Sequence, residues 1–142
     1  MLQGMTTRVA ILSAKRTPIG KFLGAFAEVP APDLAVTAIT AALVEAGVPP
    51  AEVDEVILGH ARQAGVGPNP ARQAAYRADI PETVPALTLN QACGSGLQAL
   101  FLARDRIRLG EARIVVAGGM ENMTRVPQLL PGARLGYRLG DA

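Results

Sequence analysis

The single cysteine of the chain, Cys93, stands where a nucleophile could work. It follows an apolar run at 85–90 and precedes a long apolar segment, so we expect it in a tight turn between a strand and a helix. There the thiol would lie at the positive end of the helix dipole, beside unpaired backbone amides that favour the thiolate. Gly94 and Gly96 would let a substrate approach the backbone, and the Cys93 amide could donate to an oxyanion. The spacing therefore predicts a nucleophile elbow with sulfur in place of oxygen.

Two other interpretations use the same residues. A cysteine among small neighbours can be an inert filler of a strand–helix joint. The turn also satisfies a dinucleotide-binding fingerprint, with Gly94-Ser95-Gly96 opening a G-x-G-x-x-A pattern and Glu121 as the ribose-binding acid. That fingerprint normally lies in the first strand–helix connection, and residues 14–31 lack it. From residue types alone, all three interpretations stay open.

The elements around this turn alternate between short apolar runs and segments with helical spacing. Asn69 and Pro70 suit the cap and first turn of a helix, and after Gly119 the alternation stops. The pattern predicts parallel strand–helix–strand units, hence an α/β sheet with helices on both faces. The expected strands are 8–13, 53–59, 85–90 and 113–118, and the expected helices are 32–46, 69–78 and 93–109.

Composition excludes several classes of protein. The 142 residues are 49% hydrophobic and 18% charged, unlike a disordered chain, and the longest apolar run is far shorter than the ~20 residues of a membrane span. The net charge is +2, aromatic residues are 4%, and the basic residues are scattered, which argues against nucleic-acid binding. One cysteine and one histidine argue against a disulfide framework or a metal cluster. We therefore expect a cytoplasmic protein with no membrane span, metal or resident cofactor.

Four segments carry a family resemblance. The segment 90–99, Asn-Gln-Ala-Cys-Gly-Ser-Gly-Leu-Gln-Ala, closely resembles the nucleophile segment of thiolases, the acetyl-CoA acetyltransferase family. The related ketoacyl synthases carry Cys-Ser-Ser where this chain has Cys93-Gly-Ser95, which favours the thiolase branch. The other matching segments are 13–22, 57–65 together with 69–74, and 117–123, and they follow in the family's order.

The resemblance implies acyl transfer between coenzyme A thioesters through a covalent acyl-Cys93 intermediate, with the Cys93 amide in the oxyanion hole. It also implies a homo-oligomer, a dimer or tetramer, for the full-length protein. Residues 1–120 would be the N-terminal α/β domain, one incomplete half of a duplicated fold whose sheet lacks its last strand, and 121–142 the start of an inserted loop domain. Because the family takes its acid–base residues from a second half, we expect the chain alone to be inactive. The alternative is a truncated product or a non-catalytic partner subunit.

Other matching residues are expected to be structural. His60 ends the second predicted strand, where thiolases usually carry a small or amide residue, and we interpret it as a polar strand-end residue. Asn69 and Arg72 match a stretch near the dimer interface, as a helix cap and a solvated or interface arginine. A family signature after the fourth strand, expected to be structural around the active site, comprises Met120, Glu121, Asn122 and Met123.

Overall fold

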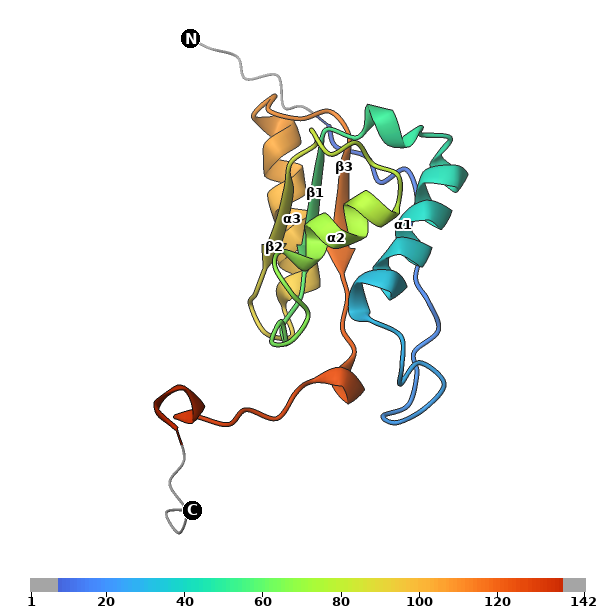
Figure 1. Ribbon diagram of the computed structural model, residues 1–142. Coiled ribbons are helices and arrows are strands. Elements are labelled where there is room, and N and C mark those ends of the chain that lie inside the picture. Colours follow the sequence, from blue (N-terminus) through green and yellow to red (C-terminus); the bar gives the residue numbers. More distant parts are fainter. Residues whose placement is uncertain (1–7, 137–142) are drawn as a thin grey trace.

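The computed structural model describes residues 8–136 and contains one parallel sheet with the strand order β2-β1-β3 (Figure 1). Val56 pairs with Ala86 of β2 on one side and with Val116 of β3 on the other. The predicted alternation of strands and helices is confirmed from the first helix onward. The elements are α1 (Ala31–Ala46), β1 (Glu55–Gly59), α2 (Pro70–Arg77), β2 (Ala86–Leu89), α3 (Ser95–Arg108) and β3 (Val115–Gly119), with short 3-10 turns at Pro50–Glu52, Met123–Arg125 and Ala133–Leu135.

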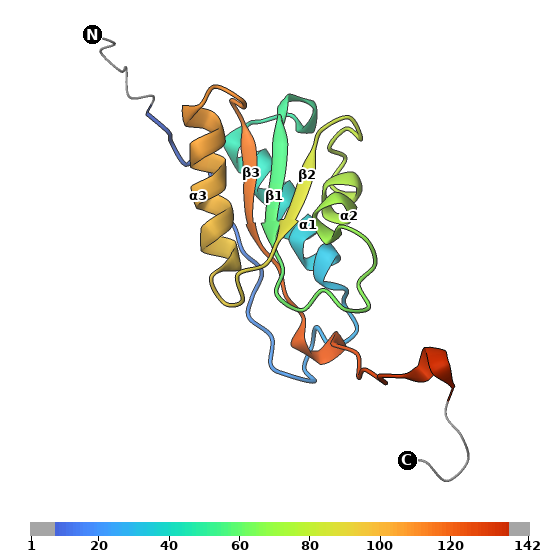
Figure 2. The same ribbon diagram turned by 90° about the vertical axis from the view of Figure 1, so that its left-hand side faces the viewer.

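Helices cover both faces of this sheet, as predicted (Figures 1 and 2). Successive side chains of a strand point to opposite faces. Val56 and Leu58 of β1 accordingly pack into the larger core with α1 and α2, whereas Ile57 packs against α3. These β1 side chains are almost fully buried, so the central strand anchors both halves of the core.

The prediction of a strand at 8–13 is wrong. The described residues before α1 contain no strand, and Ile11 and Leu12 are 80% and 62% exposed. A cavity of about 600 Å³ is lined on one side by residues 8–13 and on the other by residues 113–117, at the outer edge of β3. A strand needs the backbone of a neighbour at hydrogen-bonding distance, and this segment faces a cavity instead.

Helix boundaries differ from the predicted ones where local hydrogen bonds decide them. The Asn69 side chain accepts from the Arg72 amide at 3.2 Å, so the predicted cap of α2 is confirmed. By contrast, α3 begins at Ser95, two residues after the predicted start, with Gly94 as its N-cap. Cys93 therefore lies in the turn before the helix.

A carboxylate fixes the start of β3. Asp54 accepts the backbone N–H groups of Arg113 and Ile114 at 2.7 and 2.9 Å. These bonds, that from Ile114 first, hold the pKa of the Asp54 carboxyl below its ordinary value.

After β3, the described chain leads away from the sheet through two 3-10 turns (Figure 2). Between 8 and 136, no helix is long and apolar enough to cross a membrane. The division between residues 120 and 121 stays a prediction.

Candidate active site

The carboxyl ends of the three strands meet at one edge of the sheet. His60 follows β1 directly, Asn90 follows β2, and Met120 follows β3. Because the strands are parallel and in register, with Gly59 paired to Leu89 and to Gly119, these connections leave the sheet side by side. In open α/β sheets this edge is where ligands bind.

Two glycines let the start of α3 lie directly on this edge. A Cβ on Gly59 would lie 2.5 Å from the backbone of Ser95, and one on Gly119 would lie 3.2 Å from the Cα of Gly96. No side chain larger than hydrogen fits at the first position without moving the backbone. Gly59 and Gly119 at the strand ends therefore determine how closely the start of α3, and with it the Cys93 turn, approaches the sheet.

The turn that carries Cys93 is held by hydrogen bonds from the side chains on either side of it in the sequence, Asn90 and Ser95. Ser95 Oγ accepts from the Gln91 amide at 2.8 Å and donates to the Ala92 carbonyl at 2.7 Å. Asn90 Oδ1 accepts from the Ala92 amide at 2.9 Å. Ala92 has φ +49°, a left-handed conformation that L-residues with a Cβ adopt only when their surroundings hold them there. The turn is thus a strained backbone held by two polar side chains.

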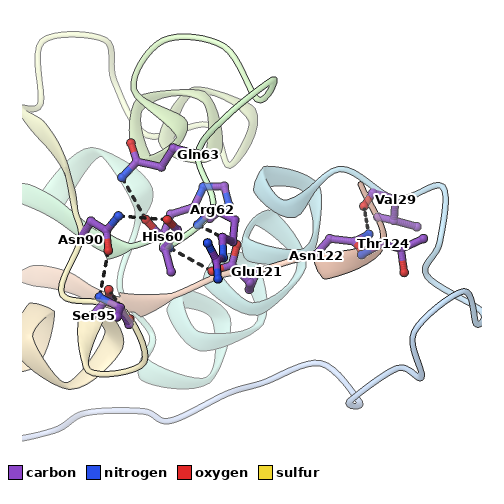
Figure 3. A network of polar contacts seen from close by, with 11 residues as sticks. Val29, His60, Arg62, Gln63, Asn90, Ser95, Glu121, Asn122 and Thr124 are labelled. Atoms are coloured by element: carbon purple, nitrogen blue, oxygen red, sulfur yellow. Dashed lines mark hydrogen bonds and ion pairs between the residues drawn. The ribbon is translucent and has the colours of Figure 1, made fainter. Parts of the chain in front are cut away.

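A second set of polar contacts joins the connections after β1 and β3 (Figure 3). The Glu121 carboxylate accepts the backbone N–H groups of Ala61 and Arg62 at 2.9 and 3.3 Å. His60 Nε2 lies 3.0 Å from Glu121 Oε1, and the histidine is 2% exposed. Asn90 Nδ2 donates to the Ala61 carbonyl at 2.9 Å, which links this set to the Cys93 turn.

An open cavity of about 650 Å³ lies where these connections meet. Cys93 is exposed and lines it together with Arg62, Asn90, Met120, Glu121 and Met123. An accessible thiol before a helix N-terminus, beside a cavity of ligand size, can attack an electrophilic carbonyl. Among residues 8–136, no group of three or more histidine, cysteine, aspartate or glutamate side chains could hold a metal ion.

Of the residues singled out in the sequence, some line this cavity and others lie away from it. Cys93 and the signature after β3 lie together: Met120, Glu121 and Met123 line the cavity beside Cys93. Asn69 and Arg72 are not among its lining residues. Arg72 is half-buried rather than solvated, and its guanidinium donates to the Val84 carbonyl.

Glu121 does not match the ribose-binding role that the dinucleotide interpretation gave it. Its carboxylate oxygens already accept two backbone amides and lie against His60. The role of Asn90 was missed, and His60 is buried in contact with Glu121 rather than only a polar strand end. A signal for both exists: each directly follows a strand, and parallel neighbours bring such positions together.

Asn122, in the connection after β3, binds the segment before α1 to the carboxyl end of the sheet. Its Nδ2 donates to the carbonyls of Phe26 and Val29 at 2.7 and 2.8 Å, and its Oδ1 accepts from the Thr124 amide at 3.0 Å. The contacts with Val29 and Thr124 appear in Figure 3. The signature after β3 therefore connects the cavity to a distant part of the sequence.

Comparison with known proteins agrees with this architecture. The model of the thiolase N-terminal domain matches residues 9–142. An acetyl-CoA acetyltransferase of Cupriavidus necator is 56% identical over 136 residues, 96% of this chain and 35% of that protein. A probable acetyl-CoA acyltransferase of Staphylococcus aureus is 53% identical over 94% of this chain and 34% of its own length.

Solved structures give the same result. The Bacillus anthracis acetyl-CoA acetyltransferase superposes with a TM-score of 0.88 at 45% identity, over 93% of this chain and 34% of that one. An Ascaris suum thiolase in complex with coenzyme A gives 0.84 at 36% identity, over 85% and 32%. The chain thus spans about a third of the length of the relatives it matches. It belongs to the thiolase family, as a thiolase N-terminal domain.

Proposed function

We propose that this chain supplies the nucleophile for acyl transfer between coenzyme A thioesters, with Cys93 as the residue that carries the acyl group. The observation that carries the proposal is the place of the only cysteine: exposed, in a strained and bonded turn, beside a cavity of about 650 Å³. An inert filler of a strand–helix joint would be buried. The family of acetyl-CoA acetyltransferases gives the substrate class.

The chemistry is a transthioesterification. The Cys93 thiolate attacks the thioester carbonyl carbon, the carbon–sulfur bond to coenzyme A breaks, and the coenzyme A thiolate leaves with a proton from solvent or an acid. The backbone amide of Cys93 donates to the oxygen that becomes negative in the tetrahedral intermediate. The acyl group then passes either to an acetyl-CoA carbanion, forming a 3-ketoacyl-CoA, or back to coenzyme A.

The second half of that reaction needs acid–base groups, which the family resemblance assigns to a further part of a thiolase. We propose that the chain by itself accepts an acyl group but does not turn over. We also propose that residues 121–142 begin an inserted loop domain, and that the complete protein is a homo-oligomer using coenzyme A thioesters without a resident cofactor.

The test separates acylation from turnover. The 142-residue chain is mixed with acetyl-CoA, and released coenzyme A and intact protein mass are followed by chromatography and mass spectrometry. We expect release of one equivalent of coenzyme A with one acetyl group added, and neither in Cys93→Ala. Acetoacetyl-CoA with coenzyme A should give no sustained cleavage.

Two results would overturn parts of this proposal. Sustained cleavage lost in Cys93→Ala would show that the chain is a complete catalyst. No acetylation of a folded chain would favour the alternative of a non-catalytic subunit.

A further inference from the structure

In the pair His60 and Glu121, the histidine is buried and the glutamate is partly exposed. His60 is 2% exposed, its Nε2 lies 3.0 Å from Glu121 Oε1, and its Nδ1 is buried without a hydrogen-bond partner among the described residues. Leaving a buried polar atom unpaired is destabilising. The fold therefore keeps this imidazole beside Glu121 despite an unfavourable contribution to stability.

Glu121 holds the backbone of the connection after β1. Its two oxygens accept the N–H groups of Ala61 and Arg62, at 2.9 and 3.3 Å. Bonds to a carboxylate are among the stronger ones in proteins. They fix the peptide plane of Ala61, whose carbonyl is the next contact.

That carbonyl leads to the nucleophile turn through one side chain. Asn90 Nδ2 donates to the Ala61 carbonyl at 2.9 Å, and Asn90 Oδ1 accepts from the Ala92 amide at 2.9 Å. Ala92 is the strained residue, φ +49°, directly before Cys93. A continuous set of contacts therefore runs from His60 through Glu121, Ala61 and Asn90 to Ala92. Figure 3 shows its polar side chains, those of His60, Glu121 and Asn90.

We infer that His60 and Glu121 form a positioning pair for the nucleophile: they hold the Ala61 peptide so that Asn90 can fix the backbone that aims the Cys93 thiol and amide. The inference rests on the proposed function in that Cys93 is the acylated residue. Neither His60 nor Glu121 needs to touch the acyl group, and the effect reaches Cys93 through backbone geometry.

The experiment compares two reactions of Cys93 in the 142-residue chain. Acetylation by p-nitrophenyl acetate passes through an oxyanion and depends on the orientation of thiol and amide. Alkylation by iodoacetamide needs only an accessible thiol. The ratio of the two rates reports positioning, which a change in global stability alone would not move.

Glu121→Ala and His60→Ala should each lower the acetylation rate about tenfold while alkylation stays close to wild type. Glu121→Gln keeps one oxygen for the Ala61 amide and should recover part of the loss. Because the two residues act as one unit, the double variant should lose no more than Glu121→Ala alone. Glu111→Gln, which removes an exposed carboxylate paired with Arg106, is the matched control and should match wild type.

Thermal melting checks that each variant folds. If Glu121→Ala does not fold, Glu121→Gln and His60→Asn carry the test. Folded variants with a wild-type rate ratio, or additive losses in the double variant, would overturn the inference. The proposed function fails differently: wild type would then react with p-nitrophenyl acetate, and the variants would lower that rate, but wild type would not react with acetyl-CoA.

Discussion

The carboxyl end of the sheet and the outer edge of β3 are built in opposite ways. At the carboxyl end, Glu121 and Asn90 join the connections after β3 and β2 to the connection after β1, and Ser95 bonds the turn that carries Cys93. At the outer edge, residues 8–13 line an apolar cavity of about 600 Å³ without forming a strand. The contacts that hold the Cys93 turn lie among the described residues, whereas no described strand pairs with the outer edge of β3.

This difference separates two contributions to function. Preorganisation of a reactive group needs local contacts of good geometry, and this domain contains them. Burial of an apolar edge needs another backbone, and an uncovered one favours association. We therefore expect substitutions at the carboxyl end to change stability and Cys93 chemistry, and substitutions at the edge to change mainly association.

The largest expected effect is that of Gly59→Ala. Its Cβ would lie 2.5 Å from the Ser95 backbone, so α3 must shift, at a cost of about 3 kcal/mol in unfolding free energy. Gly118→Ala is the matched control in the same sheet, because its nearest neighbour, Leu58, would lie at an ordinary 3.9 Å. Urea unfolding measures both. Equal losses of unfolding free energy in the two variants would show that the contact of Gly59 with α3 is no tighter than the contact of Gly118 with Leu58.

The next effect is that of Asn122→Ala. It removes the donor to the Phe26 and Val29 carbonyls and should lower the unfolding free energy by about 2 kcal/mol. Hydrogen exchange should speed up in residues 23–29 more than in β1. Glu82→Ala, an exposed carboxylate, serves as the control. Unchanged exchange would mean that this segment is held by other contacts.

A smaller effect, with a defined pH range, concerns Asp54. Its pKa is lowered in the fold from 3.8, so its contribution to stability is complete above that pH and is lost as pH falls through the lower, folded-state value. Asp54→Asn should cost about 1 kcal/mol at neutral pH, and the difference should shrink in acid. Thermal melts from pH 7 downward test this. A difference in stability that is constant with pH would show that the negative charge of Asp54 does not contribute.

The smallest effect on stability is expected at the edge. Ile11 is 80% exposed, so Ile11→Asp should change the unfolding free energy by less than about 0.5 kcal/mol. We predict that the wild-type chain self-associates and that this substitution reduces the association, as measured by sedimentation. A wild-type monomer with a cooperative thermal transition would contradict the contrast between edge and carboxyl end.

Most of the helices and strands could be predicted from local pattern. Asn69 and Pro70 marked the start of α2 because capping depends only on neighbouring residues. The absence of a strand at 8–13 could not be predicted. A branched apolar run indicates a preference for strand pairing, but it does not show whether a partner backbone lies beside it. The start of α3 was misplaced by two residues because the bonds of Ser95 to Gln91 and Ala92, not helical spacing, decide it.

The site was predictable as far as its position along the chain. The strand–turn–helix pattern placed Cys93 in a turn before a helix, and the family resemblance to thiolases is confirmed. The bond between Ala61 and Glu121 spans 60 residues and depends on strand order, which a single sequence does not state. The position of the signature after β3, beside the Cys93 cavity, agrees with the prediction. The bond of Glu121 to the connection after β1 was not predicted.

The most direct test of the central claim, that the fold activates Cys93 toward acetyl-CoA, compares native and unfolded chain. The rate of acetylation at Cys93 is measured by peptide mapping, once in buffer and once in urea at the same pH. The account predicts that the native chain reacts at least about tenfold faster, because the turn orients the Cys93 thiol and places the Cys93 amide as an oxyanion donor. Equal rates in the two conditions would contradict it.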